Sequence, residues 1–381
     1  MNTLFYFYPH CFINVTKNEF FVYNTHTFEK LHFNNIHFPT GDRNTLNKGY
    51  ILHRNEIEDI ISSCKDLNMG YDIEYDEVIP YMNNRKLKFI TSLEKEYKYL
   101  NHNLPSYTNN LLNSITFLLN NSVNLNYSTH VYSQIGYPHL NEEPIDYKRY
   151  IEMLKSFPSL REVILAGEIN EEDLIRFLKK ASENAFNVIY RVFGSSISVE
   201  RIHYLLDSYE DLYIELIINR NDSLDELKSK THNRLFVKAI IQELNDIQLF
   251  SEFSNLSYIP IFQENKNNQD LLSEIVMNKN EILSIKKSLR ELLYSSYINI
   301  NAFGRISIDF DGNVFCLNQR IGSLTSSDLP CLINQWIREE DCMWFYCRNK
   351  KELCQECALS SLCPAINIYE AQGIYRGACM I

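Results

Sequence analysis

Eight of the chain's ten cysteines lie after residue 315, and residues 65–315 contain none. Four of the eight share a short spacing, Cys354-x2-Cys357-x5-Cys363, with Cys379 two residues from the end of the sequence. Four thiolates can close a tetrahedral zinc site or supply one ligand to each iron of a [4Fe–4S] cluster. The four therefore form a predicted metal site. The spacing favours iron–sulfur over zinc, because zinc sites usually repeat the C-x2-C pair or combine it with histidines.

The other four clustered cysteines are Cys316, Cys331, Cys342 and Cys347. Their separations are irregular, so the sequence makes them only a second candidate site. Unligated thiols are the alternative for these four. Among the ten histidines no H-E-x-x-H or triad-like local motif occurs, and no glycine-rich phosphate loop is present. No catalytic residue is predicted, because nothing independent of the cysteines indicates a nucleophile.

The first elements along the chain predict a small β-then-α module. Residues 4–15, 19–23 and 28–33 are rich in aromatic and β-branched side chains, as strands prefer. Residues 55–67 carry apolar side chains at helical spacing, with Asn55 as the expected cap. Cys64 falls on that apolar stripe and is expected to be a buried small hydrophobe rather than a ligand.

The middle of the chain alternates strand and helix patterns, which predicts parallel βαβ units. About six strands are expected, enough for a partial barrel. Residues 86–120 are expected to be mainly helical, and residues 269–294 to form one helix. The expected strands are 123–131, 163–166, 186–193, 212–218, 235–241 and 258–262, and the expected helices between them are 147–156, 171–181, 199–208 and 223–230.

Composition limits the partners and the compartment. The net charge of −11 gives no attraction to nucleic acid or to an anionic membrane. No signal peptide precedes the first strand, and no apolar run reaches the roughly 18 residues of a membrane helix. A cytoplasmic location is therefore expected. In that reducing compartment clustered cysteines indicate metal binding more than disulfides.

The last segment combines several features in a fixed order. Alternating residues around Asp311-Gly312-Asn313 predict a β-hairpin, and Cys316 follows it. An Ile-Gly-x-Leu segment at 321–324, Trp336, and then the C-x2-C-x5-C spacing complete the order. Residues 295–381 therefore resemble the SPASM domain, the C-terminal auxiliary-cluster domain of radical SAM peptide maturases.

This resemblance implies that the C-x2-C-x5-C cysteines and Cys379 bind the auxiliary cluster called II. Cys316 matches one ligand of auxiliary cluster I. Ser327 and Asn367 stand where that cluster has two further ligands. One cluster is therefore expected, with a second only if Cys331, Cys342 or Cys347 replace the missing ligands.

Radical SAM enzymes hold their reactive cluster with C-x3-C-x2-C after the first barrel strand. The expected strand at 123–131 is followed by residues 132–138, which lack cysteine. The segment Leu165-Ala166-Gly167-Glu168-Ile169 resembles the Gly-Gly-Glu-Pro motif that meets the SAM amino group, although an ordinary strand-to-helix turn explains it equally well. The chain thus resembles pseudo-radical-SAM/SPASM proteins of Bacteroidales-type peptide-modification systems, and no SAM binding is expected.

The N-terminal module resembles the winged-helix peptide-recognition element of such maturases. That element binds a precursor's leader as an added β-strand. The resemblance places the leader between the strand at 27–33 and the helix at 55–67; a structural cap on the barrel is the alternative. Acidic Glu56, Glu58 and Asp59 disfavour a nucleic-acid-binding winged helix. The predicted peptide-binding residues are Thr27, Phe28, Leu31, Phe33, Ile57 and Ile61.

Together these features predict an α/β fold in three parts. Residues 1–80 form a winged-helix-like module, residues 81–295 a degenerate (β/α)6-type radical-SAM-like partial barrel, and residues 296–381 a SPASM-like domain. The expected function is in RiPP biosynthesis: binding a precursor peptide, a partner maturase or both, without SAM cleavage. One alternative is an enzyme whose auxiliary cluster ligates a substrate thiol or relays electrons. Another is a zinc-stabilised interaction protein.

Overall fold

The computed structural model describes ten stretches of the chain, and Cys379, Asn55 and the expected helix at 223–230 lie outside them. No helix in these stretches is both long and apolar enough to cross a bilayer. The stretches are residues 3–36, 38, 46, 49–52, 57–74, 110–121, 129–139, 147–222, 232–262 and 269–373.

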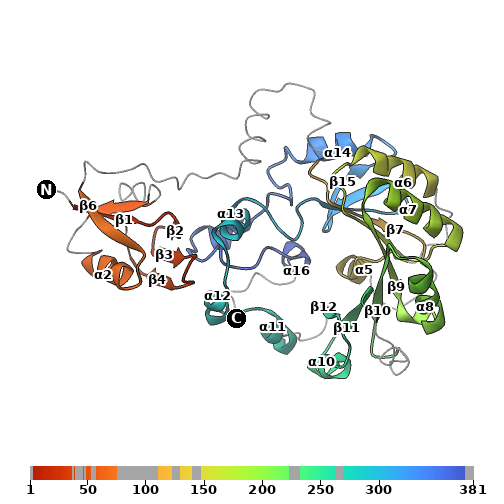
Figure 1. Cartoon of the computed structure of the whole chain (residues 1–381), viewed down its shortest axis with the longest axis horizontal. Coiled ribbons are helices and arrows are strands. Elements are labelled where there is room, and N and C mark those ends of the chain that lie inside the picture. The colour runs from red at the N-terminus through yellow and green to blue at the C-terminus, as the bar shows by residue number, and fades with distance from the viewer. Residues whose placement is uncertain are drawn as a thin grey trace.

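A nine-stranded sheet forms the centre of a mixed α/β fold (Figure 1). Six of its strands pair parallel to one another in chain order, as the alternation of strand and helix patterns predicts. The closed curvature of a (β/α)6 barrel stays a prediction. The six strands are β7 (Ser114–Leu118), β8 (Glu162–Ala166), β9 (Asn187–Phe193), β10 (Leu212–Ile218), β11 (Leu235–Ile241) and β12 (Leu256–Pro260).

Helices cover both faces of this sheet. The connecting helices α6 (Tyr147–Met153), α7 (Glu171–Asn184) and α8 (Val199–Ser208) follow their predicted positions and share one apolar core with the sheet. The α10 helix (Leu244–Phe250) belongs to the same core and was not predicted. A separate cluster joins α5 (Thr129–Ile135) to Phe193 and Ile217. Alternate residues of a strand point to opposite faces. The α5 helix therefore lies on the other face from α7 and α8 (Figure 1).

Two element predictions in the barrel region are wrong. Among the described residues the first parallel strand is β7, inside the segment expected to be helical, and residues 129–135 form α5 instead of the end of a strand. Residues 123–128 of the expected strand lie outside the described stretches. The β7 segment, Ser-Ile-Thr-Phe-Leu, pairs on both sides and is almost wholly buried, so sheet pairing outweighs local pattern.

The expected helix at 269–294 is three helices, α11 (Gln269–Ile275), α12 (Lys279–Ser284) and α13 (Leu289–Tyr297). Asn278 and Ser288 interrupt it because each forms a capping box that starts a new helix.

The C-terminal hairpin belongs to the same sheet as the barrel strands. It comprises β13 (Arg305–Ile308) and β14 (Asn313–Cys316), as predicted, and β15 (Gln319–Ser323) extends it. Strand β13 pairs parallel with β7. The α14 helix (Leu329–Trp336) then packs its apolar side into the main core.

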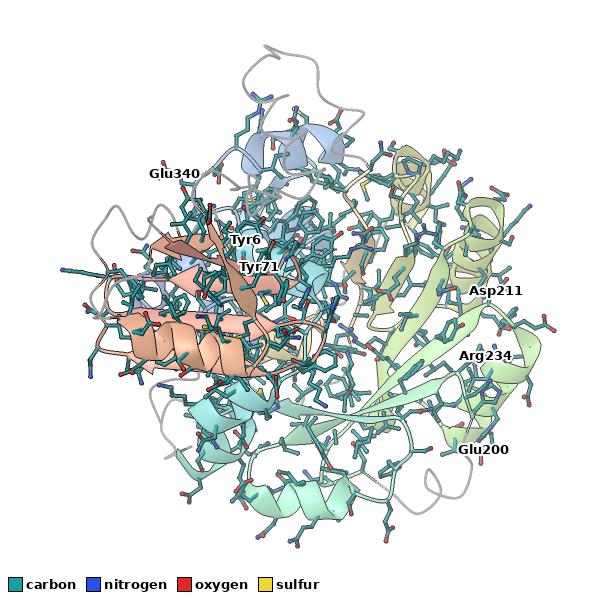
Figure 2. The ribbon with its side chains drawn as sticks, turned by 60° about the vertical axis from the view of Figure 1, so that its left-hand side comes forward. Tyr6, Tyr71, Glu200, Asp211, Arg234 and Glu340 are labelled. Carbon is teal, nitrogen blue, oxygen red and sulfur yellow. The ribbon has the colours of Figure 1, made fainter. Side chains whose placement is uncertain are left out.

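The N-terminal module contains two three-stranded sheets and α2 (Glu58–Asp66). The expected strand at 4–15 is two strands, and α2 begins after Ile57, which is its N-cap residue. Cys64 is fully buried, as predicted. Figure 2 shows Tyr6 and Tyr71 together on paired strands of this module. The sheets are β5-β1-β6 (Tyr50–Leu52, Thr3–Phe7, Gly70–Glu74) and β2-β3-β4 (Cys11–Val15, Glu19–Asn24, Lys30–Asn34).

The β2-β3-β4 sheet is covered on both faces. Phe20 and Val22 face the cluster that contains α2, whereas Phe21 and Tyr23 face a cluster formed by α12, α13 and residues 358–363. Figure 1 shows α12 and α13 beside this module, between it and the large sheet. The N-terminal module is therefore packed directly against the cysteine-rich segment.

Candidate metal site and peptide-binding edge

The three described cysteines of the C-x2-C-x5-C spacing lie on one compact loop. Cys354 is in the short helix α15 (Glu352–Gln355), and the amide of Cys357 donates to the Cys354 carbonyl at 3.2 Å. Both are half-buried, whereas Cys363 is buried and its amide donates to Leu359. We call residues 354–363 the cysteine loop.

Arg348 brings two of these thiols into one electrostatic environment. Its Nη1 lies 3.9 Å from the Sγ of Cys354, and its guanidinium also interacts electrostatically with Cys363. A guanidinium favours the thiolate form, which is the form that binds metal.

A buried carboxylate holds Arg348 in place. Glu370, in α16 (Ile368–Ala371), accepts hydrogen bonds from Nη1 and Nη2 of Arg348 at 2.8 and 2.9 Å and from Lys351 Nζ at 2.5 Å. The Glu370 side chain is 0% exposed and that of Arg348 is 6% exposed. Burial would lower the pKa of Arg348, but Glu370 and the nearby thiols raise it overall. Two cations facing one carboxylate leave a net positive charge beside the cysteine loop.

Lys287 adds a further cation, which is half-buried. Its Nζ donates to the carbonyls of Ser361 and Cys363 at 3.0 and 3.3 Å and to the hydroxyl of Ser295 at 3.1 Å. Burial lowers the pKa of Lys287 to about 8, although Cys363 and Glu291 act in the opposite direction. The two bonds to carbonyl oxygens hold the C-terminal end of the cysteine loop in place.

The donor chemistry of this loop fits a thiolate-bound metal. Cys354, Cys357 and Cys363 supply three soft ligands, and Arg348 and Lys287 offset the negative charge that several thiolates would carry. Within the described stretches no group of three or more His, Cys, Asp or Glu side chains is arranged to hold a metal ion. The four-cysteine ligand set stays a prediction, because its fourth member lies outside those stretches.

The second candidate set is spread over the C-terminal region. Cys316 and Cys342 are both buried and near enough to interact: desolvation raises the pKa of Cys316, and Cys342 raises it further. The Sγ of Cys347 instead donates to the carbonyl of Ser296 at 3.3 Å. Cys331 is exposed. The structure thus brings two of the four cysteines, Cys316 and Cys342, close together as free thiols. A second metal site stays a prediction.

The position expected for the SAM-cluster motif changes with the first strand. The motif would follow the first strand directly. Since that strand is β7, which ends at Leu118, the motif would lie in residues 119–128 instead of 132–138. This segment also contains no cysteine, so the conclusion drawn from the cysteine-free range 65–315 is unaltered.

Gly167 and Glu168 form a tight crossing between β8 and the end of β7. Gly167 has φ +116°, and a Cβ there would lie 2.3 Å from the Asn120 carbonyl oxygen and 2.9 Å from Pro138 Cγ. The Glu168 amide donates to that same carbonyl at 2.6 Å. The turn requires glycine at position 167 and fixes the backbone of Glu168, and the role of the Glu168 side chain stays a prediction.

We expect Gly167→Ala to destabilise the protein by more than the roughly 1–3 kcal/mol of backbone strain alone. Gly373→Ala is the matched control, because Gly373 has φ +73° with nothing within 4 Å of an added Cβ. Urea unfolding of both variants measures the difference. Equal losses would show that contact with Asn120 and Pro138 is unimportant.

The predicted peptide-binding strand lies at a sheet edge. Among the described residues β4 pairs only with β3. Leu31 and Phe33 are half-buried against the cluster that contains Ile57 and Ile61. Ile57 and Ile61 are themselves 7% and 1% exposed, so in this structure they support β4 from beneath.

Thr27 and Phe28 lie in the exposed turn before β4. Phe28 has φ 66° and is 38% exposed, and Lys286 Nζ lies 5.4 Å from its ring centre. Its exposed ring offers an apolar contact at the start of the edge strand.

Sequence reasoning missed the charged residues around the cysteine loop. Arg348, Lys351 and Glu370 are close to the cysteines in sequence, which was the only available signal. Nothing in their local pattern shows that Glu370 is buried, and Lys287 is distant along the chain.

Comparisons with known proteins give only distant similarity. No protein-family model matches the sequence, and the curated proteins include no significant match. The crystal structure of Streptococcus suis SuiB bound to precursor peptide SuiA aligns with 99% of this chain and 100% of SuiB, at 13% identity and TM-score 0.48. SuiB bound to S-adenosylmethionine aligns with 98% of this chain and 97% of SuiB, at 14% identity and TM-score 0.44. Similarity at this level does not by itself establish a shared activity.

Proposed function

We propose that this protein acts in peptide maturation by binding a precursor peptide, with a metal centre on the cysteine loop and without SAM cleavage. The observation that carries the proposal is the packing of the β2-β3-β4 sheet, with β4 at its edge, directly against the cysteine loop. A peptide-binding element and a thiol-rich centre on one unit suit a protein that presents a peptide for modification.

Peptide binding at β4 would proceed by strand addition. An extended peptide gains main-chain hydrogen bonds from the outer edge of the strand and side-chain contacts from pockets next to it. Phe28 in the turn before β4 and the partly exposed Leu31 and Phe33 provide apolar contacts for peptide side chains. This edge would give affinity, and the apolar side chains would give sequence preference.

The metal centre would be held by Cys354, Cys357 and Cys363, with Cys379 as the fourth ligand. With all four ligands in place, a [4Fe–4S] cluster there would supply electron transfer. Arg348, paired with Glu370, and Lys287 would stabilise the thiolates by their positive charge. SAM cleavage is not proposed, because residues 65–315 offer no thiolates to anchor a reactive cluster.

We expect Phe28→Ser to weaken binding of a synthetic precursor peptide by roughly tenfold or more, since burying an aromatic side chain contributes about 1.5–3 kcal/mol. Fluorescence anisotropy with the labelled synthetic peptide gives the affinity. Phe236→Ser is the matched control, because Phe236 is 39% exposed but lies on β11 of the large sheet. Equal affinity of the two variants would refute binding at β4, and absence of binding by the unaltered protein would refute the peptide partner.

A further inference from the structure

Ala358 ties the cysteine loop to the N-terminal sheet through its backbone. It directly follows Cys357 and is fully buried. Its amide donates to Glu19 Oε2 at 2.7 Å, and its carbonyl accepts from Asn14 Nδ2 at 2.8 Å. Buried backbone groups require hydrogen-bond partners. Here side chains of β2 and β3 provide them, from residues more than three hundred positions away in the sequence.

Further contacts repeat the same connection. Asn14 Nδ2 also lies 3.4 Å from the hydroxyl of Ser360, and the amide of Lys17 donates to Glu356 Oε2 at 3.4 Å. The hydroxyl of Tyr23 accepts from the amide of Lys287, whose ammonium group holds the Cys363 carbonyl. Phe12, Phe21 and Tyr23 share one apolar cluster with Ala358, Leu359, Leu362 and Cys363.

Glu19 extends this connection to the edge strand. Its Oε2 binds the amide of Ala358, and its Oε1 lies 3.6 Å from His32 Nε2 on β4. The His32 side chain is 7% exposed and that of Glu19 is 23% exposed, so water screens these contacts only in part. One carboxylate thus contacts both the cysteine loop and the strand proposed to bind peptide.

We propose that the β2–β3 hairpin is a structural part of the cysteine loop, so that metal binding on this loop and the stability of the β2-β3-β4 sheet are thermodynamically coupled. This inference rests on the proposed metal site. Asn14 and Glu19 are positioning residues: they hold the backbone between Cys357 and Cys363 and would not touch the metal. By linkage, a metal that orders the loop also stabilises the sheet, and an ordered sheet also favours metal binding.

Hydrogen exchange of the complete protein, measured by mass spectrometry, tests the coupling. We compare metal-loaded protein with the same protein stripped of metal by a chelator under anaerobic conditions. Coupling energies between sites typically correspond to factors of about 5–150. Amides of residues 11–34 should therefore exchange faster by a factor in this range after metal removal. Residues 187–218, in strands β9 and β10 and the α8 helix between them, should not change.

Glu19→Ala should reduce this metal dependence and speed release of the metal to the chelator. Glu29→Ala is the matched control, because Glu29 is exposed in the turn of the same sheet and its side chain accepts a hydrogen bond from the hydroxyl of neighbouring Thr27. If Glu19→Ala fails to fold, Asn14→Ala removes the partner of the Ala358 carbonyl and serves the same purpose.

The outcomes separate the inference from the proposed function. Metal bound to the protein, with equal exchange of residues 11–34 in both states, would overturn the coupling and leave the metal site standing. Purified protein that binds neither iron nor zinc would overturn the metal site, and the coupling with it. A metal effect that persists unchanged in Glu19→Ala and Asn14→Ala would show that these two residues do not carry it.

Discussion

Replacing Cys357 with serine should remove the metal from the anaerobically purified protein. A serine hydroxyl is not ionised at neutral pH and is a much harder ligand than a thiolate, so the centre would lose one of four anchors. For comparison, structural zinc binds zinc-finger peptides with apparent free energies of about 10–16 kcal/mol at pH 7. We therefore expect this substitution to have the largest effect of any single change in the chain.

Metal analysis of the purified protein measures the loss. An intact [4Fe–4S] centre gives about four irons per chain and a brown colour, whereas one zinc and no iron would replace the cluster assignment with a zinc site. Cys331→Ser is the matched control, because Cys331 is the exposed cysteine among the described residues. Metal content should be unchanged in that variant. Full metal content in Cys357→Ser would exclude the proposed ligand set, and a loss in both variants would include the second candidate set.

Replacing Glu370 with alanine should destabilise the folded protein by about 3–5 kcal/mol. The substitution leaves the guanidinium of Arg348 and the ammonium of Lys351 partly or wholly buried without their common carboxylate. Removing one partner of a buried pair costs this much because the remaining charge keeps its desolvation penalty and loses its compensation. The same change frees Arg348 to move from its place beside Cys354.

Guanidinium chloride unfolding at neutral pH gives the free energy of unfolding of this variant. Glu172→Ala is the control: Glu172 also pairs with an arginine, but its side chain is 78% exposed, so the unfolding midpoint should hardly move. A loss below about 1 kcal/mol for Glu370→Ala would mean that water reaches Arg348 and Lys351 when the carboxylate is removed.

Periodicity was sufficient to predict elements whose apolar pattern is strong. The strands at 212–218 and 235–241 and the helix at 199–208 have the predicted bounds. The hairpin around Gly312 is also confirmed, because φ +76° is required at that turn and glycine adopts it readily. In these segments local preference and tertiary packing act in the same direction.

Periodicity failed where long-range pairing selects among similar segments. Residues 114–118 and 123–131 both carry apolar and β-branched side chains, so local pattern could not identify the first strand. The pairing of β7 with both β8 and β13 identifies β7 as the first strand. Strand β13 lies nearly two hundred residues later in the chain, so this pairing cannot be read from local sequence. The interruption at Asn278 and Ser288 was missed for a different reason: each residue is compatible with a helix surface, and only its capping geometry shows a break.

The sequence by itself determined the chemistry available to this protein: a C-x2-C-x5-C set of thiols near one end, and no cysteine across the region where a SAM cluster would be anchored. Both follow from residue identity and spacing, which folding does not change. Only the tertiary structure decided what surrounds those thiols. Glu370 is buried against Arg348, and Asn14 and Glu19 hold the backbone at Ala358, because burial and hydrogen-bond satisfaction depend on contacts between segments far apart in the chain.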